Sequence, residues 1–74
     1  MARKLVNGRT TLGQRIRFHR ERLGLTQMQL GIRMGSSQTY VWWLEQDRSV
    51  PTARTIRRIA KGLGVEVADL VSSL

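Results

Sequence analysis

The residues best suited to recognition chemistry lie between Gln38 and Gln46, where amides, a hydroxyl and two adjacent indoles occur together. A glutamine can form two hydrogen bonds with an adenine, and a threonine offers a hydroxyl or a methyl group. Because an α-helix turns about 100° per residue, one side of a helix here carries Ser37, Val41 and Leu44. The opposite side presents side chains that can contact base edges: Gln38, Thr39, Trp42 and Trp43. A merely solvated role is the alternative for Gln38.

The adjacent residues Trp42 and Trp43 cannot both be core residues by this geometry. An indole can contact a thymine methyl group through its apolar surface, or donate its N–H to a phosphate. We therefore place Trp42 on the side that faces a nucleic acid. For Trp43 two interpretations stay open: it contacts DNA, or it packs over the preceding helix or at a subunit contact.

The chain offers little from which to build a catalytic site. It has one histidine, no cysteine and five acidic residues, without the spacing of paired carboxylates or metal ligands. The absence of cysteine also excludes disulfides and thiolate-bound metals. We therefore predict that the protein is not an enzyme and needs no cofactor, metal or small-molecule ligand. His19 is expected to be an exposed helix residue.

The charge distribution favours a polyanionic partner. Thirteen Lys and Arg residues against five Asp and Glu residues give a formal net charge of +8. All 13 bases lie within residues 1–61, whereas residues 62–74 contain only the acids Glu66 and Asp69. We expect the basic part to face the ligand and the apolar, acidic tail to face away. A solvated, arginine-rich surface without a partner is the alternative.

The length of 74 residues indicates one small soluble domain. No apolar run approaches the ~20 residues of a membrane span, so we expect a cytoplasmic protein without a membrane partner. Residues 1–10 lack a helical period, and we predict a flexible basic arm there, followed by a DNA-binding domain over residues 11–74. A start without function is the alternative. The basic residues of the arm are Arg3, Lys4 and Arg9.

The apolar spacing predicts an all-α fold of five helices, since no segment alternates like a strand. A first helix over about 11–23 would bury a stripe of Leu12, Ile16 and Leu23. Thr26 and Gln29 fit a capping box for a helix over about 27–34. A third helix is expected over about 37–46. A fourth should begin at Pro51 and Thr52 and end at Gly62 and Gly64, and a short fifth helix should cover about 67–72.

Two glycines make the segment 27–46 a predicted helix-turn-helix. Counted from Gln27, Gly31 is fifth, where a side chain larger than alanine would push the two helices apart. Gly35 is ninth, where a positive φ favours glycine, and Val41 is fifteenth, where an apolar plug fits. In a basic chain, this geometry presents the second helix to the major groove of DNA.

On these residues the chain resembles the phage repressor and Cro-type helix-turn-helix family over about residues 12–70. The motifs that carry the resemblance include RERLGLTQ at 20–27, LGIRMG at 30–35 and IAKGLGV at 59–65. The resemblance implies a compact, lambda-repressor-like domain that binds double-stranded DNA sequence-specifically and regulates transcription, as a repressor above all. The sequence departs from the family pattern at Gly31, Ser36, Asp47 and Glu66. Asp47 would place an acid near the phosphates.

The resemblance also implies roles around the recognition helix. It matches Gln27 to a phosphate-binding position, and it matches Arg20 and Glu45 to a partly buried ion pair that does not contact bases. Basic side chains and helix N-termini around the helix suit phosphates. The expected phosphate contacts are Gln27, Arg33, Arg48, Thr52, Arg54 and Arg57. For each arginine alone, a solvated surface position is the alternative.

A single domain reads about half of an operator, so we expect a homodimer on a pseudo-palindromic operator with half-sites ~34 Å apart. The expected dimer surface is Val65, Val67, Leu70, Val71 and Leu74, with a core-only role as the alternative. Two other functions are open to the same fold. One is an antitoxin, although a toxin-binding antitoxin usually adds a segment outside the domain. The other is an accessory protein of phage recombination that bends DNA.

Overall fold

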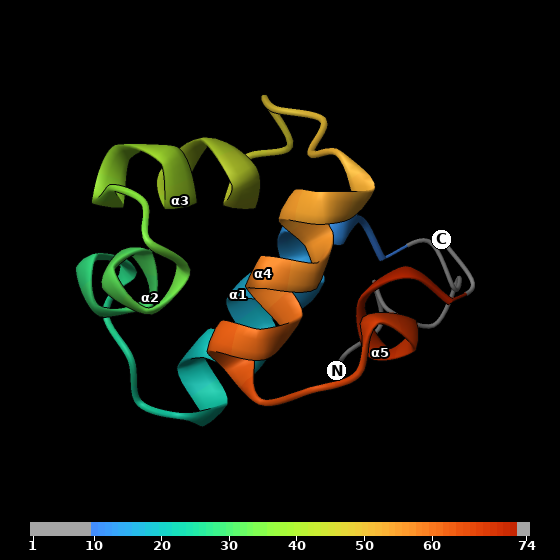
Figure 1. Ribbon diagram of the computed structural model, residues 1–74, viewed down its shortest axis with the longest axis horizontal. Helices are drawn as coiled ribbons and strands as arrows, with labels where there is room; N and C mark the ends of the chain where they lie inside the picture. Colours follow the sequence, from blue (N-terminus) through green and yellow to red (C-terminus); the bar gives the residue numbers. More distant parts are fainter. Residues whose placement is uncertain (1–9, 73–74) are drawn as a thin grey trace.

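The computed structural model describes residues 10–72, which form five α-helices and no strand (Figure 1). The predicted all-α fold is therefore confirmed, with helix ends within one or two residues of those expected. The expected arm residues Arg3, Lys4 and Arg9, and Leu74 of the expected dimer surface, lie outside the described residues. The helices are α1 (Leu12–Arg22), α2 (Gln27–Met34), α3 (Gln38–Glu45), α4 (Ala53–Leu63) and α5 (Val67–Val71).

Hydroxyl side chains begin the first four helices. Thr26 accepts a hydrogen bond from the backbone of Gln29, whose side chain accepts one from the backbone of Thr26 in return, so the predicted capping box is confirmed. Thr11 forms a second capping box with Gln14 at the start of α1, whereas Ser37 and Thr52 cap α3 and α4 with their hydroxyl groups alone. Each cap satisfies a backbone N–H that has no partner within the helix, a contribution of about 1 kcal/mol.

All five helices contribute to one core. Its fully buried side chains are Ile16, Leu30, Val41, Leu44, Ile59 and Leu70. Leu23, expected in the buried stripe of α1, is instead 49% exposed, because α1 ends at Arg22 and the chain turns at Leu23. Leu70 was expected on a dimer surface, but α5 packs on α1 and α4 and buries it completely. Its side chain therefore cannot form an interface.

Gly62 lies inside α4 rather than at its end. The helix continues to Leu63 and ends at Gly64, which has a φ of 70°. A Cβ atom added at Gly62 would lie 3.4 Å from side-chain atoms of Leu30 and Met34 on α2. This is ordinary van der Waals contact, so α4 packs against α2 here and still leaves room for a methyl group at position 62.

The crossing of α2 and α3 depends on the two predicted glycines. Gly35 ends α2 with a φ of 72°, as expected for the turn. A Cβ atom added at Gly31 would lie 2.9 Å from the backbone carbon and oxygen of Ser37. Figure 1 shows α3 and the loop to α4 along one edge of the molecule, above α2. No other helix covers this side of α3, and its residues Gln38, Thr39, Trp42 and Trp43 are exposed.

Candidate nucleic-acid interface

Three side chains that helical periodicity placed outward on α3 come together with Gln27 of α2, which was expected at a phosphate. They line a hollow of about 260 Å³, formed by Gln27, Gln38, Thr39 and Trp42. Gln38 and Thr39 occupy the first turn of α3, and both are exposed. Trp42 is 40% exposed and lies one turn further along. The hollow therefore combines amides, a hydroxyl and an indole, the groups that suit hydrogen bonding and apolar contact with base edges.

Trp43 is also exposed, at 49%, but it does not line this hollow. Its neighbour Trp42 has a charged partner instead. The guanidinium carbon of Arg48 lies 5.6 Å from the centre of the Trp42 ring system. Such a cation–π contact contributes about 0.5–1 kcal/mol at an exposed site. Arg48, expected at a phosphate, thus also restrains the indole at the end of the recognition helix.

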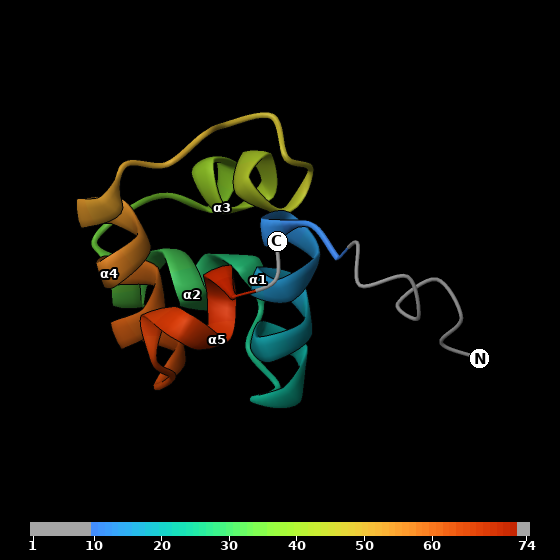
Figure 2. The same ribbon diagram turned by 90° about the vertical axis from the view of Figure 1, so that its right-hand side faces the viewer.

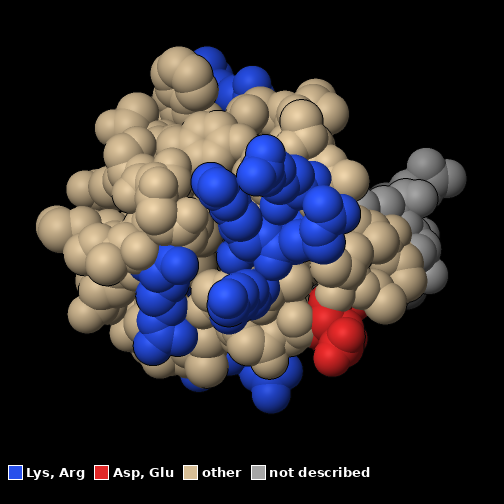
Figure 3. Space-filling model, viewed as in Figure 1, with Lys and Arg blue, Asp and Glu red and all other residues tan. Residues whose placement is uncertain are grey.

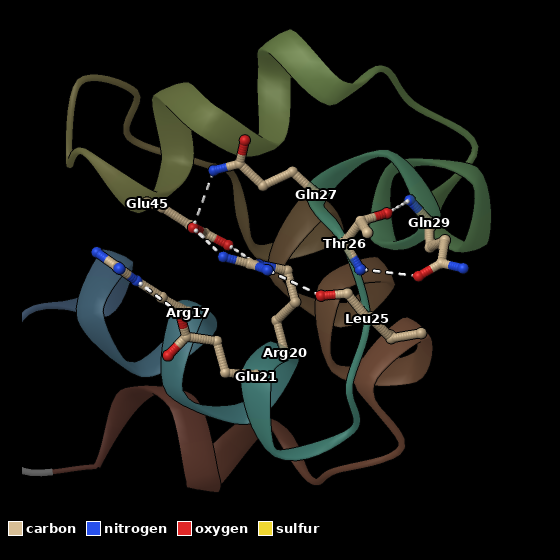
Figure 4. A network of polar contacts seen from close by, with 8 residues as sticks. All are labelled: Arg17, Arg20, Glu21, Leu25, Thr26, Gln27, Gln29 and Glu45. Atoms are coloured by element: carbon tan, nitrogen blue, oxygen red, sulfur yellow. Dashed lines mark hydrogen bonds and ion pairs between the residues drawn. The ribbon is translucent and has the colours of Figure 1, made fainter.

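The ion pair that the resemblance implied between Arg20 and Glu45 is present (Figure 4). Two parallel hydrogen bonds join the side chains, from Nε to Oε2 at 2.5 Å and from Nη2 to Oε1 at 3.0 Å. Glu45 is only 7% exposed, and its hydrogen bond raises the pKa of the Arg20 guanidinium. The remaining terminal nitrogen of Arg20 donates to the carbonyl of Leu25 at 2.8 Å. The pair therefore joins α1, the following loop and the end of α3.

Gln27 belongs to the same network. Its side-chain Nε2 donates to Oε1 of Glu45 at 3.1 Å, as Figure 4 shows. One amide N–H is thus used within the protein, while the carbonyl oxygen and the second N–H keep their hydrogen-bonding capacity. The side chain reaches the hollow in a restrained position, held by the buried carboxylate.

Asp47, the acid expected near the phosphates, is exposed, but one of its carboxylate oxygens is used within the protein. It has a φ of 57°, and its Oδ1 accepts a hydrogen bond of 2.9 Å from the backbone N–H of Gly13. A Cβ atom at Gly13 would lie 2.5 Å and 2.6 Å from the carbonyl oxygens of Leu44 and Glu45. Sequence reasoning missed this contact, for which the one local signal is a glycine in the first turn of α1.

The expected phosphate contacts divide into two groups. Thr52 and Arg54 are exposed at the start of α4, next to the loop that follows α3, and Arg57 is exposed one turn further. Arg33 lies at the other end of α2, where its Nη1 donates to the carbonyl of Gly62 at 3.2 Å. The structure does not bring Arg33 to the hollow lined by Gln38. Its side chain lies against α4 instead and lines a different hollow, together with Arg58 and Lys61.

The remaining polar residues between 10 and 72 form no metal centre, since no three His, Asp or Glu side chains of this range could hold an ion. His19 is half-buried rather than exposed, with its ring edge-on to Phe18 at 5.2 Å between centres. None of the helices in the described part is long and apolar enough to cross a membrane.

Two short helices crossing at Gly31, with a capped and outward-facing second helix, define a helix-turn-helix protein. The chain belongs to the helix-turn-helix domain family, whose model matches residues 11–74.

Individual relatives agree with this assignment. The chain is 38% identical over 61 residues to the immunity repressor protein of Bacillus phage phi105, covering 82% of this chain and 42% of that protein. It is 43% identical over 56 residues to an uncharacterized HTH-type transcriptional regulator of Sinorhizobium fredii, covering 76% and 71% of the two chains. The chain thus spans less than half of the phage repressor's length.

A solved structure shares the fold. It is the P22 c2 repressor protein in complex with a synthetic operator, with a TM-score of 0.79 and 25% sequence identity. The match covers 86% of this chain and 97% of that one. The predicted membership of the phage repressor type of helix-turn-helix family is therefore confirmed.

Proposed function

We propose that this chain is a sequence-specific DNA-binding transcriptional regulator of the repressor type, which inserts α3 into the major groove. The observation that carries the proposal is the hollow of Gln27, Gln38, Thr39 and Trp42 on the free side of α3. It lies in a fold shared with a repressor solved on its operator. No catalytic role is part of this proposal.

Gln38 and Thr39 read base edges from the first turn of α3, where a recognition helix enters the groove. Trp42 adds apolar contact, for instance with a thymine methyl group. Backbone phosphates are held around this centre by Arg48, Arg54, Arg57 and the capped N-terminus at Thr52. Gln27 binds a further phosphate from the wall of the hollow. Arg20 and Glu45 hold the helix in place without touching a base.

The regulator binds a pseudo-palindromic operator as a homodimer, since one α3 reads only one half-site. The residues offered for the contact are half-buried: Val65, Val67 and Val71. Light scattering of the free protein and of its complex with DNA tests this part separately. A monomer in both states rejects the homodimer and leaves the DNA-binding proposal intact.

Selection of bound duplexes from a random pool tests the function. We expect an enriched, symmetric sequence with half-sites about 10 base pairs apart. Gln38→Ala should lose discrimination at one base pair of each half-site, about 1–3 kcal/mol. Gln29→Ala is the control within the same helix-turn-helix. The side chain of Gln29 caps α2 and does not line the hollow. A pool without enrichment, or equal specificity in both variants, would refute the proposal.

A further inference from the structure

A row of cations runs along the outer side of α4. Because a helix turns about 100° per residue, Arg54, Arg57, Arg58 and Lys61 lie within about 100° of its circumference, opposite the buried Ile59 and Leu63. All four are exposed, and none forms an ion pair within residues 10–72. Figure 3 shows Lys and Arg side chains gathered over α4, with acidic atoms on this face only beside α5.

The far end of the row opens into a second hollow. It measures about 420 Å³ and is lined by Arg33, Met34, Arg58, Lys61 and Gly62. The hydrogen bond of Arg33 to the carbonyl of Gly62 holds its guanidinium at the wall, with the other N–H groups free to donate. A guanidinium fixed in this way loses little freedom on binding a phosphate. Three cations therefore converge on one hollow.

This hollow is separate from the surface that α3 presents. The row starts at Arg54, in the first turn of α4 beside the loop after α3, and extends about 10 Å along the helix to Lys61. In Figure 1 the axis of α4 leads away from the edge formed by α3 and that loop. A straight duplex lying on α3 therefore contacts the beginning of the row and leaves its end free.

We infer that Arg33, Arg58 and Lys61 form a second binding surface for the phosphodiester backbone of DNA. Several observations favour this ligand. The row is continuous with the DNA-reading edge at Arg54, because the Cβ atoms of its residues three or four positions apart lie about 5–6 Å from each other. No aromatic side chain lines the hollow to hold a peptide. The inference rests on the proposed DNA-binding function and adds a second contact to it.

Two sources can supply the phosphates, either the flank of the same duplex bent around the protein or a second duplex. The variant Arg58→Ala/Lys61→Ala removes two of the three charges that line the hollow and keeps good helix formers in α4. The control variant Arg17→Ala/Arg22→Ala removes the same charge from exposed positions of α1. Figure 2 places α1 on the side opposite α4, so the control has the same net charge but an intact hollow.

The first measurement compares the protein's affinity for two duplexes. The short duplex, of about 20 base pairs, contains only the selected site, and the long duplex extends it by several turns of DNA. In the second measurement the short duplex is immobilised and saturated with protein. We then measure whether this bound protein captures a labelled duplex of unrelated sequence. Tighter binding of the extended duplex identifies the bent flank, and capture identifies a second duplex. Either gain should disappear in Arg58→Ala/Lys61→Ala and persist in the control. The slope of log affinity against log salt should fall by about 0.9 for each lost phosphate contact.

The inference is overturned if the unmodified chain shows neither gain, or if the control variant loses as much as the α4 variant. These outcomes are independent of the proposed function. The proposed function fails if Gln38→Ala leaves the sequence specificity on the short duplex unchanged. The second surface is tested separately, by the affinity gained with the extended duplex and by capture of the unrelated duplex.

Discussion

The carboxylate of Asp47 accepts the backbone N–H of Gly13 at 2.9 Å, and this bond ties the loop after the recognition helix to the first turn of α1. The two residues are 34 positions apart in sequence. One of the N–H groups that α1 cannot satisfy internally thus donates to a side chain of the loop after α3. The contact lies where the end of α3 approaches α1, and it therefore helps to set the position of α3.

Asp47→Ala should destabilise the fold by about 1–3 kcal/mol, because the Gly13 N–H loses its partner while α1 stays packed against α3. Asp47→Asn is the matched control, since it keeps the acceptor oxygen and tolerates the positive φ. Urea unfolding should place it closer to the unmodified protein. Equal loss in both variants would show that the charge, and not the hydrogen bond, matters.

Glu45→Gln should lower the free energy of unfolding by up to about 3–5 kcal/mol, because it leaves Arg20 with an unpaired charge at a largely buried site. The matched control is Glu21→Gln. That change breaks an exposed pair with Arg17, worth at most about 0.5 kcal/mol. The two free energies of unfolding, measured under the same conditions, should therefore differ clearly. Similar small losses would argue against a structural role for the buried pair.

The same pair predicts a direction for the effect of pH. Its hydrogen bond raises the pKa of Arg20 in the folded protein above the ordinary value. A raised pKa stabilises the fold at every pH below the ordinary arginine value, and this contribution is lost only as pH rises through the folded pKa. Titration of Arg20 should therefore add no slope to stability around neutral pH. Replacing Arg20 with lysine, whose ordinary pKa is lower, should bring the loss of stability to lower alkaline pH.

Trp42→Ala should weaken binding of the selected operator about tenfold or more and relax its sequence preference, while helical content is retained. Trp42→Phe is the control, because a phenyl ring keeps apolar surface and a face for Arg48. Fluorescence anisotropy at one fixed salt concentration measures both affinities. An unchanged affinity of the alanine variant would remove Trp42 from the interface.

Two glycine-to-alanine substitutions should have opposite effects. At Gly62 the new Cβ meets only side-chain atoms at 3.4 Å, so the variant should gain up to about 1 kcal/mol from helix propensity. At Gly31 the Cβ would lie 2.9 Å from the backbone of Ser37, which caps α3. Gly31→Ala should therefore gain no stability and should bind the operator more weakly. Thermal unfolding and anisotropy check both points, and a stabilised Gly31→Ala with full affinity would contradict them.

Local patterns sufficed to predict most of the helices. The capping box of Thr26 and Gln29 and the left-handed turn at Gly35 depend on residues within a few positions of each other. The outward face of α3 follows from helical periodicity once Val41 and Leu44 are recognised as core. For this reason periodicity alone could place Gln38, Thr39 and Trp42 on one side of the helix.

The sequence by itself thus determined the helices, the sharp turn between α2 and α3, and which side of α3 is free. Tertiary structure decided the features that depend on distant segments. Leu70 is buried because α1 and α4 cover α5, and Arg33 is drawn to the last turn of α4, 29 positions away. The bond between Gly13 and Asp47 likewise needs α1 beside the end of α3. No periodicity encodes such contacts, because they arise only when the helices pack.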